Sequence, residues 1–167
     1  MKELKYINHY SNETQVQVHQ LIEQEKLSNY LLNKYPKAHT IKTDKALFSY
    51  VNEYKNDFMK KSGILSKVVY DGKINVIHNA LGTHRFISRV QGSKLKSKNE
   101  IHIASMFKNT PEDFLRMIVI HELAHFKEKE HNKAFYKLCE HMEPSYHQLE
   151  FDLRLYLTHI DLFGKLY

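Results

Sequence analysis

The sequence is poor in the residues and patterns that mark several large classes of protein. Its 167 residues include one cysteine, Cys139, so no intrachain disulfide can form and no cage of thiolates can hold a metal. No apolar run approaches the roughly 20 residues that cross a bilayer. Residues 1–15 lack the apolar segment of a secretory signal. These absences predict a cytoplasmic protein with no membrane partner.

Glycine and proline are also scarce, with five and three residues, and the chain has no repeat, low-complexity tract or Gly/Ser linker. Hydrophobic residues make up 42% and charged residues 26%, which is typical of a globular protein. A chain of this length has the usual size of one domain. We therefore expect a single domain over residues 1–167.

The charge is unbalanced, with 25 Lys and Arg against 19 Asp and Glu, a formal net charge of +6. An excess of this sign favours anionic partners such as nucleic acid, nucleotides or phosphate-rich surfaces. The alternative is that the excess only keeps the protein in solution. Lysine content alone does not distinguish the two.

The spacing of apolar residues predicts helices in the first part of the chain and strands in the middle. One helix is expected over residues 12–34, ended by Pro36, and another from Thr43 or Asp44 to Ser62-Gly63. The period then changes. "KVVYDGKINVIH" predicts a hairpin, and "HRFISRV" and "EIHIA" predict two more strands, joined by the lysine-rich loop "QGSKLKSKN".

Helices return after the strands. Thr110 is expected to cap the next helix, with Pro111 at its first position, and this helix is expected to run to about Lys129. Two more follow, from Asn132 to Met142 and after Pro144. The order predicts an α+β domain: an N-terminal helical part over residues 1–65, and a core over residues 66–167 in which a small antiparallel sheet packs on a helix.

Three histidines and a glutamate stand out in "IVIHELAHFKEKEHNKAF". His121 and His125 are four residues apart, so on a helix they lie on one face and can bind the same cation. Glu122 lies about a third of a turn away, where it can accept a proton from a water that the metal activates. A catalytic zinc needs a third protein ligand and an open position, and His131 can supply that ligand if the chain folds back.

The motif "HELAHFKEKEHNKAFYKLCEHMEP" resembles the YgjP-like metallopeptidase family, which is related to SprT-like and other zincin-fold proteins. The resemblance includes "SRVQGSKLKSKNEIHIAS" and "PEDFLRMIVIHELAH" and spans nearly the whole chain. It implies a zincin-like core with His121, His125 and His131 as metal ligands and Glu122 as the general base. Metzincins have a similar spacing but carry a glycine where this chain has Glu128. The turn toward His131 must therefore be made in another way.

The resemblance implies metal-dependent hydrolysis but leaves the substrate open between a peptide and a nucleotide, because YgjP-like proteins are also described as UTP pyrophosphatases. A peptide would pair with an exposed strand edge, for which "EIHIA" is the candidate. A triphosphate would need cations, and Arg89, Lys94 and Lys96 are the candidates. Three imidazoles favour zinc or another divalent transition metal over magnesium, which prefers oxygen ligands.

A third possibility is a nucleic-acid docking module in which the basic surface binds and the metal is structural. Such a site needs a fourth ligand, because structural zinc is usually closed by four protein ligands. The other candidate histidines are His102, His141, His147 and His159. Tyr146 is a candidate donor to the oxyanion of the substrate. Cys139 is expected to be a buried small hydrophobe.

Overall fold

The fold was obtained as a computed structural model, which describes residues 3–74, 82–91 and 94–167, with side chains described over 3–74 and 98–167. The predicted α+β class is confirmed. In chain order the elements are α1 (Asn12–Glu23), α2 (Leu27–Lys34), α3 (Asp44–Phe58), β1 (Leu65–Asp71), β2 (Gly82–Gln91), β3 (Lys94–Ala104), the short 3₁₀ helix η2 (Ser105–Asn109), α4 (Glu112–Ala124), α5 (Lys133–Met142) and α6 (Tyr146–Phe163).

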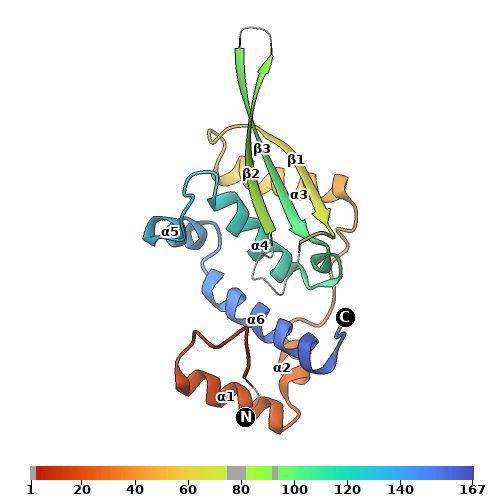
Figure 1. Cartoon of the computed structure of the whole chain (residues 1–167). Coiled ribbons are helices and arrows are strands. Elements are labelled where there is room, and N and C mark those ends of the chain that lie inside the picture. The colour runs from red at the N-terminus through yellow and green to blue at the C-terminus, as the bar shows by residue number, and fades with distance from the viewer. Residues whose placement is uncertain (1–2, 75–81, 92–93) are drawn as a thin grey trace.

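The three strands form one mixed sheet in the order β1-β3-β2 (Figure 1). β2 and β3 are antiparallel, as predicted, but β1 runs parallel to β3, which corrects the expected all-antiparallel sheet. β1 and β3 are not consecutive in the chain, and the long connection between them allows a parallel pair. The second half of the predicted hairpin after Asp71 falls in residues 75–81, outside the described part of the chain.

The sheet also corrects the predicted role of "EIHIA". These residues lie in β3, which is the central strand and pairs with β1 on one side and β2 on the other. The side chains of Ile101 and Ile103 are fully buried, and their partners Val68 and Tyr70 on β1 are buried with them. β3 is thus a core strand, and its backbone has no free edge where "EIHIA" pairs with both neighbours.

The N-terminal helical region is divided into two helices where one was predicted. α1 and α2 are separated at Glu25, which has a positive φ of 55°. The N–H of Lys26 donates to the carbonyl of Leu21 and that of Glu25 donates to Ile22, so a Schellman turn closes α1. A glycine usually marks such a turn in sequence, and its absence here hid the break.

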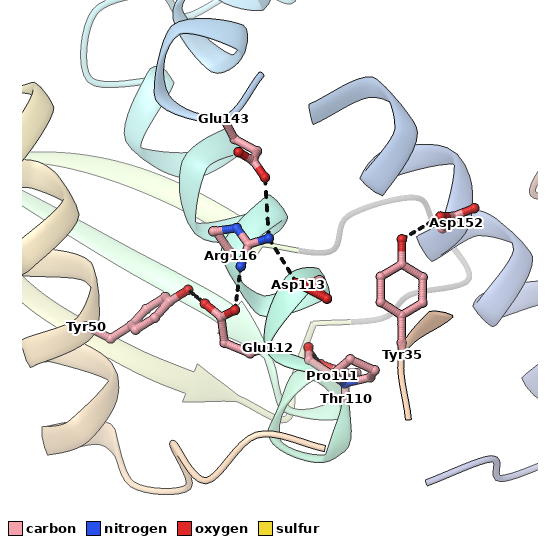
Figure 2. Close-up of polar contacts among 9 residues, drawn as sticks. All are labelled: Tyr35, Tyr50, Thr110, Pro111, Glu112, Asp113, Arg116, Glu143 and Asp152. Atoms are coloured by element: carbon pink, nitrogen blue, oxygen red, sulfur yellow. Dashed lines mark hydrogen bonds and ion pairs between the residues drawn. The ribbon is translucent and has the colours of Figure 1, made fainter. Parts of the chain in front are cut away.

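The first two helices are attached to the rest of the protein through α6, which contacts α2. The carboxylate of Asp152 on α6 is fully buried and accepts hydrogen bonds from the hydroxyls of Tyr30 and Tyr35 and from the ammonium of Lys34. Figure 2 shows the contact with Tyr35. α1, α2 and α6 lie together at one end of the molecule, and the sheet, α3 and α4 at the other (Figure 1). The segment that contains α1 and α2 therefore packs against α6.

The start of α4 differs from the prediction by one residue. α4 begins at Glu112 with Pro111 as its N-cap, and Thr110 instead donates its hydroxyl to the carbonyls of Phe107 and Pro111. Thr110 is fully buried at the end of η2, so its hydroxyl is used there. The two acids at the start of α4, Glu112 and Asp113, face the positive end of the helix dipole, as expected.

A cluster of charged side chains holds α4 to its neighbours. The guanidinium of Arg116 contacts Glu112 and Asp113 in the first turn of α4 and Glu143 after α5, and the hydroxyl of Tyr50 on α3 donates to Glu112 (Figure 2). Almost all of the other side chains of α4 are buried in one hydrophobic core that extends from Leu4 to Leu157. α4 is thus fixed in place before its last turn, which carries the histidines.

Among the helices of the described residues, none has the length and apolar character needed to cross a membrane.

Candidate metal centre

The helix that carries the first two histidines ends sooner than predicted. α4 stops at Ala124, with His125 as its C-cap, whereas the sequence suggested an end near Lys129. The N–H groups of Lys127 and Glu128 both donate to the carbonyl of Ala124, so the chain turns immediately after His125. Among the described residues only Glu25 has a positive φ outside glycine, so Glu128 makes no left-handed turn. The chain folds back toward His131 without the glycine that metzincins use.

This turn brings the three predicted ligands together. The Nε2 atom of His131 lies 3.2 Å from Nε2 of His121 and 3.1 Å from Nε2 of His125. Three nitrogens bound to one tetrahedral ion at 2.0–2.1 Å would be about 3.3–3.4 Å apart. The observed separations are close to that value. The His121–His125–His131 cluster is also the one group of metal-ligating side chains found among the described residues.

Neighbouring groups orient the imidazoles so that their Nε2 atoms meet. Nδ1 of His125 lies 2.9 Å from the carbonyl oxygen of Glu128 and donates to it, which leaves a lone pair on Nε2. The fully buried ring of Phe135 packs against all three imidazoles, with centroid distances of 4.9, 4.7 and 5.0 Å. Asn132 caps α5 by accepting from the N–H of Phe135, which fixes the chain direction just after His131.

Burial keeps the inner ligands neutral. Burial, together with the positive charges that His125 and His131 would carry, lowers the pKa of His121 to about 3. Burial also lowers the pKa of His125. Neutral imidazoles are the form that binds a metal, so these two residues are ready to bind at neutral pH. Since nitrogen lone pairs that face one another repel, a divalent cation at their centre fits this arrangement.

Glu122 is only 3% exposed, and burial raises the pKa of its carboxyl to about 8. A carboxylate with a raised pKa accepts a proton more readily at neutral pH than an ordinary one. Its place in the chain next to His121 puts it at the same turn of α4 as the converging rings. The role of Glu122 as the general base stays a prediction.

Tyr146 lies beside the three-histidine cluster and contacts it through its hydroxyl. Its fully buried hydroxyl is 2.7 Å from Nδ1 of His121, whereas Nε2 of His121 faces the other histidines. The imidazole ring of His121 therefore separates the hydroxyl from the place where an oxyanion would form. The role of Tyr146 as a donor to the oxyanion stays a prediction, and in this structure its hydroxyl contacts His121 on the side of the ring away from Nε2.

The predicted phosphate-binding residues Arg89, Lys94 and Lys96 occupy the far end of the β2–β3 ribbon, where Arg89 pairs with Lys96 and Gln91 with Lys94. The expected loop between the strands is mostly strand. This end of the ribbon stands clear of α4 and the other helices (Figure 1). The side chains of Arg89, Lys94 and Lys96 lie outside the described part of the structure, so the role of these residues in substrate binding stays a prediction.

None of the other candidate histidines joins the cluster within the described residues. His102 contacts the carboxylates of Asp71 and Glu100, and His147 contacts Glu140. Cys139 is buried, and burial raises the pKa of its thiol to about 12, so it is a neutral side chain as expected. Within the described residues no fourth protein ligand joins the three histidines, and the expected open position on the metal stays a prediction.

Comparison with known proteins shows the family. The YgjP-like metallopeptidase domain matches residues 5–156. The chain belongs to the YgjP-like family. A UTP pyrophosphatase of Escherichia coli (strain K12) is 55% identical to this chain over 162 residues, 97% of each protein. No solved structure matches the chain. As a YgjP-like protein with this relative, the chain is a hydrolase.

Sequence reasoning missed the packing of Phe135 and the acceptor role of the Glu128 carbonyl. An apolar residue at the start of a helix has the same appearance in sequence whether it fills a core or supports a metal ligand, and a backbone carbonyl leaves no signal. The early end of α4 was also missed, since Phe126 to Glu130 continue a helix-compatible composition.

Proposed function

We propose that this YgjP-like protein is a UTP pyrophosphatase that depends on a divalent metal, held by His121, His125 and His131. The main support for this proposal is the 55% identity to a UTP pyrophosphatase over 97% of both chains. An identity this high over the whole length supports a reaction shared with that relative. The three histidines and Glu122 are the residues expected to carry it. The net charge of +6 suits an anionic substrate. A nucleotide substrate is also in keeping with the predicted cytoplasmic location.

A bound divalent metal would supply Lewis-acid chemistry, lowering the pKa of water and polarising a phosphoryl oxygen. The chain's own contribution to the reaction is the carboxylate of Glu122. It takes a proton from the attacking water while the water oxygen bonds to phosphorus. The phosphoanhydride bond breaks, and pyrophosphate leaves with the bonding electrons. Because Glu122 is deeply buried, its carboxylate is kept away from the charged side chains of the surface.

We infer zinc, or another late transition metal, from the donor set. Neutral imidazoles suit such ions, and magnesium prefers oxygen ligands. We expect about one such ion per purified chain, because three converging imidazoles bind transition metals well. Elemental analysis checks this, before and after incubation with zinc, and a chain that retains none would remove the basis of the proposal.

Peptide hydrolysis is the second candidate, because the matching family is described as a metallopeptidase domain. The structure removes the expected support for it, since "EIHIA" lies in the central strand. β2 is the edge strand on the side that contacts α4, and it would be the remaining place for an extended peptide.

The decisive experiment offers UTP and an unfolded polypeptide to the same zinc-loaded protein and measures pyrophosphate and new peptide ends. We expect pyrophosphate, and we expect Glu122→Gln to lower its release by about 10²–10⁴-fold because the proton acceptor is lost. Glu130→Gln is the matched control, an exposed carboxylate in the loop before His131.

The other outcomes separate the candidates. Peptide cleavage without pyrophosphate would establish the peptidase. Salt-sensitive DNA binding with neither product would favour the docking module. Replacing Lys94 and Lys96 by alanine in the same assay tests the ribbon: a raised KM for UTP would support a phosphate contact, and an unchanged KM would remove these residues from the site.

A further inference from the structure

The second ring nitrogen of His121 is held by a residue from another helix. Nδ1 of His121, on α4, lies 2.7 Å from the hydroxyl of Tyr146, in the first turn of α6. The Tyr146 side chain is fully buried, so no bulk water competes for this contact. The hydrogen bond therefore fixes how the His121 ring stands relative to the other two imidazoles.

The direction of this hydrogen bond decides whether His121 can bind a metal. If the hydroxyl donated to Nδ1, the single proton of the neutral ring would sit on Nε2, which would then have no lone pair for an ion. If Nδ1–H donates to the hydroxyl oxygen, Nε2 keeps its lone pair and faces His125 and His131. The proton of Tyr146 must then have an acceptor elsewhere.

Glu150 is placed to be that acceptor. It follows Tyr146 by four residues on α6, so both side chains lie on the same face of the helix. After burial, the negative charge of Glu150 is the next cause that raises the pKa of Tyr146, so the carboxylate lies near the phenol. Arg154, one turn further on, has its Nε 3.7 Å from a carboxylate oxygen of Glu150.

We propose that Tyr146 and Glu150 are positioning residues of the metal centre: Glu150 accepts the hydroxyl proton of Tyr146, so that the hydroxyl oxygen accepts from Nδ1–H of His121. The inference rests on the metal site of the proposed function. In metal sites a ligating histidine usually donates its other N–H to an acceptor, and removal of such partners costs about 10–100-fold in metal affinity. Here a tyrosine stands between the histidine and the carboxylate.

The test is the affinity of metal-free protein for Zn²⁺, measured by competition with a chromophoric chelator. Tyr146→Phe should weaken zinc binding about 10–100-fold. The matched control is Tyr136→Phe, which removes a hydroxyl from a tyrosine whose ring centroid is 6.3 Å from that of Tyr146, and it should leave the affinity unchanged. The unfolding midpoint of each metal-free variant verifies that it is folded.

Glu150 is tested through a double-mutant cycle. Glu150→Met, which has no acceptor, should weaken zinc binding in the wild-type background and have no effect in the Tyr146→Phe background. Glu150→Gln should restore most of the affinity, because its amide oxygen can accept the same proton.

Each result bears on the proposal. Unchanged zinc affinity in Tyr146→Phe would overturn it, and so would an effect of Glu150→Met that persists without the tyrosine hydroxyl. If Tyr146→Phe does not fold, Glu150→Met against Glu150→Gln decides, and equal affinities would overturn the role of Glu150. A wild-type protein that binds no zinc would instead defeat the proposed function, so the two failures are distinguishable.

Discussion

The burial of Glu122 predicts a stability effect that can be measured without any substrate. Burial raises the pKa of its carboxyl from the ordinary value of 4.5 to about 8 in the folded, metal-free protein. A pKa that is higher in the folded state means that the folded state binds the proton more tightly than the unfolded state. The wild-type protein therefore loses stability as pH rises from about 4.5 to 8.

The size of this loss follows from the two pKa values. Each pKa unit corresponds to about 1.4 kcal/mol, so the rise from 4.5 to about 8 sets a ceiling of roughly 5 kcal/mol on the cost of the charged carboxylate. Because Glu122 is only 3% exposed, solvent screening reduces this value little. Glu122→Gln removes the titrating group and keeps the shape, so the variant should avoid the cost.

The assay is urea unfolding of the two metal-free proteins at pH 5 and pH 9. At pH 5 their free energies of unfolding should be similar. At pH 9 the variant should be more stable by a few kcal/mol, up to the ceiling above. Glu130→Gln, at an exposed carboxylate in the loop before His131, should show no such change. A difference between wild type and Glu122→Gln that does not vary with pH would refute a charge-dependent cost of burial at this position.

Two further predictions concern the elements around the site. Tyr35→Phe should lower the free energy of unfolding by about 1–3 kcal/mol in urea titrations, because the buried carboxylate of Asp152 loses a donor; an unchanged free energy would show that the remaining donors compensate. Asn132→Ala should cost about 1 kcal/mol through the lost N-cap of α5 and also weaken zinc binding, since it releases the segment after His131. Thr43→Ala removes the N-cap of α3 and should cost a similar amount with the zinc affinity unchanged, and equal losses of zinc affinity in both variants would contradict the local role of Asn132.

Local signals were reliable where the residues that decide a feature are neighbours in the chain. The sequence left the start of α3 open between Thr43 and Asp44, and the structure decides for Thr43 as the N-cap, since its hydroxyl accepts from the N–H of Ala46. The helix predicted from Asn132 to Met142 is found as α5 from Lys133 to Met142, with Asn132 as its N-cap. The prediction that Thr110 caps α4 was wrong, because its hydroxyl donates to the carbonyl of Phe107 in the neighbouring buried turn η2. The end of α4 was wrong because no glycine or proline marks it.

The sequence by itself determined the chemical character of the site. The four-residue spacing of His121 and His125 places both on one face of any helix. The same helical geometry places Glu122 about a third of a turn from His121. The lone cysteine excluded a thiolate cage. The α+β order of elements also followed from local periodicity.

Only the tertiary structure decided which residues surround that site. The approach of His131 depends on where α4 stops, and the contact of Tyr146 with His121 joins two helices that are 25 residues apart at these positions. The order of the sheet places β3 in the centre, which removed the expected free edge of "EIHIA". These features depend on packing between distant segments, and the pattern of one segment does not record the position of another.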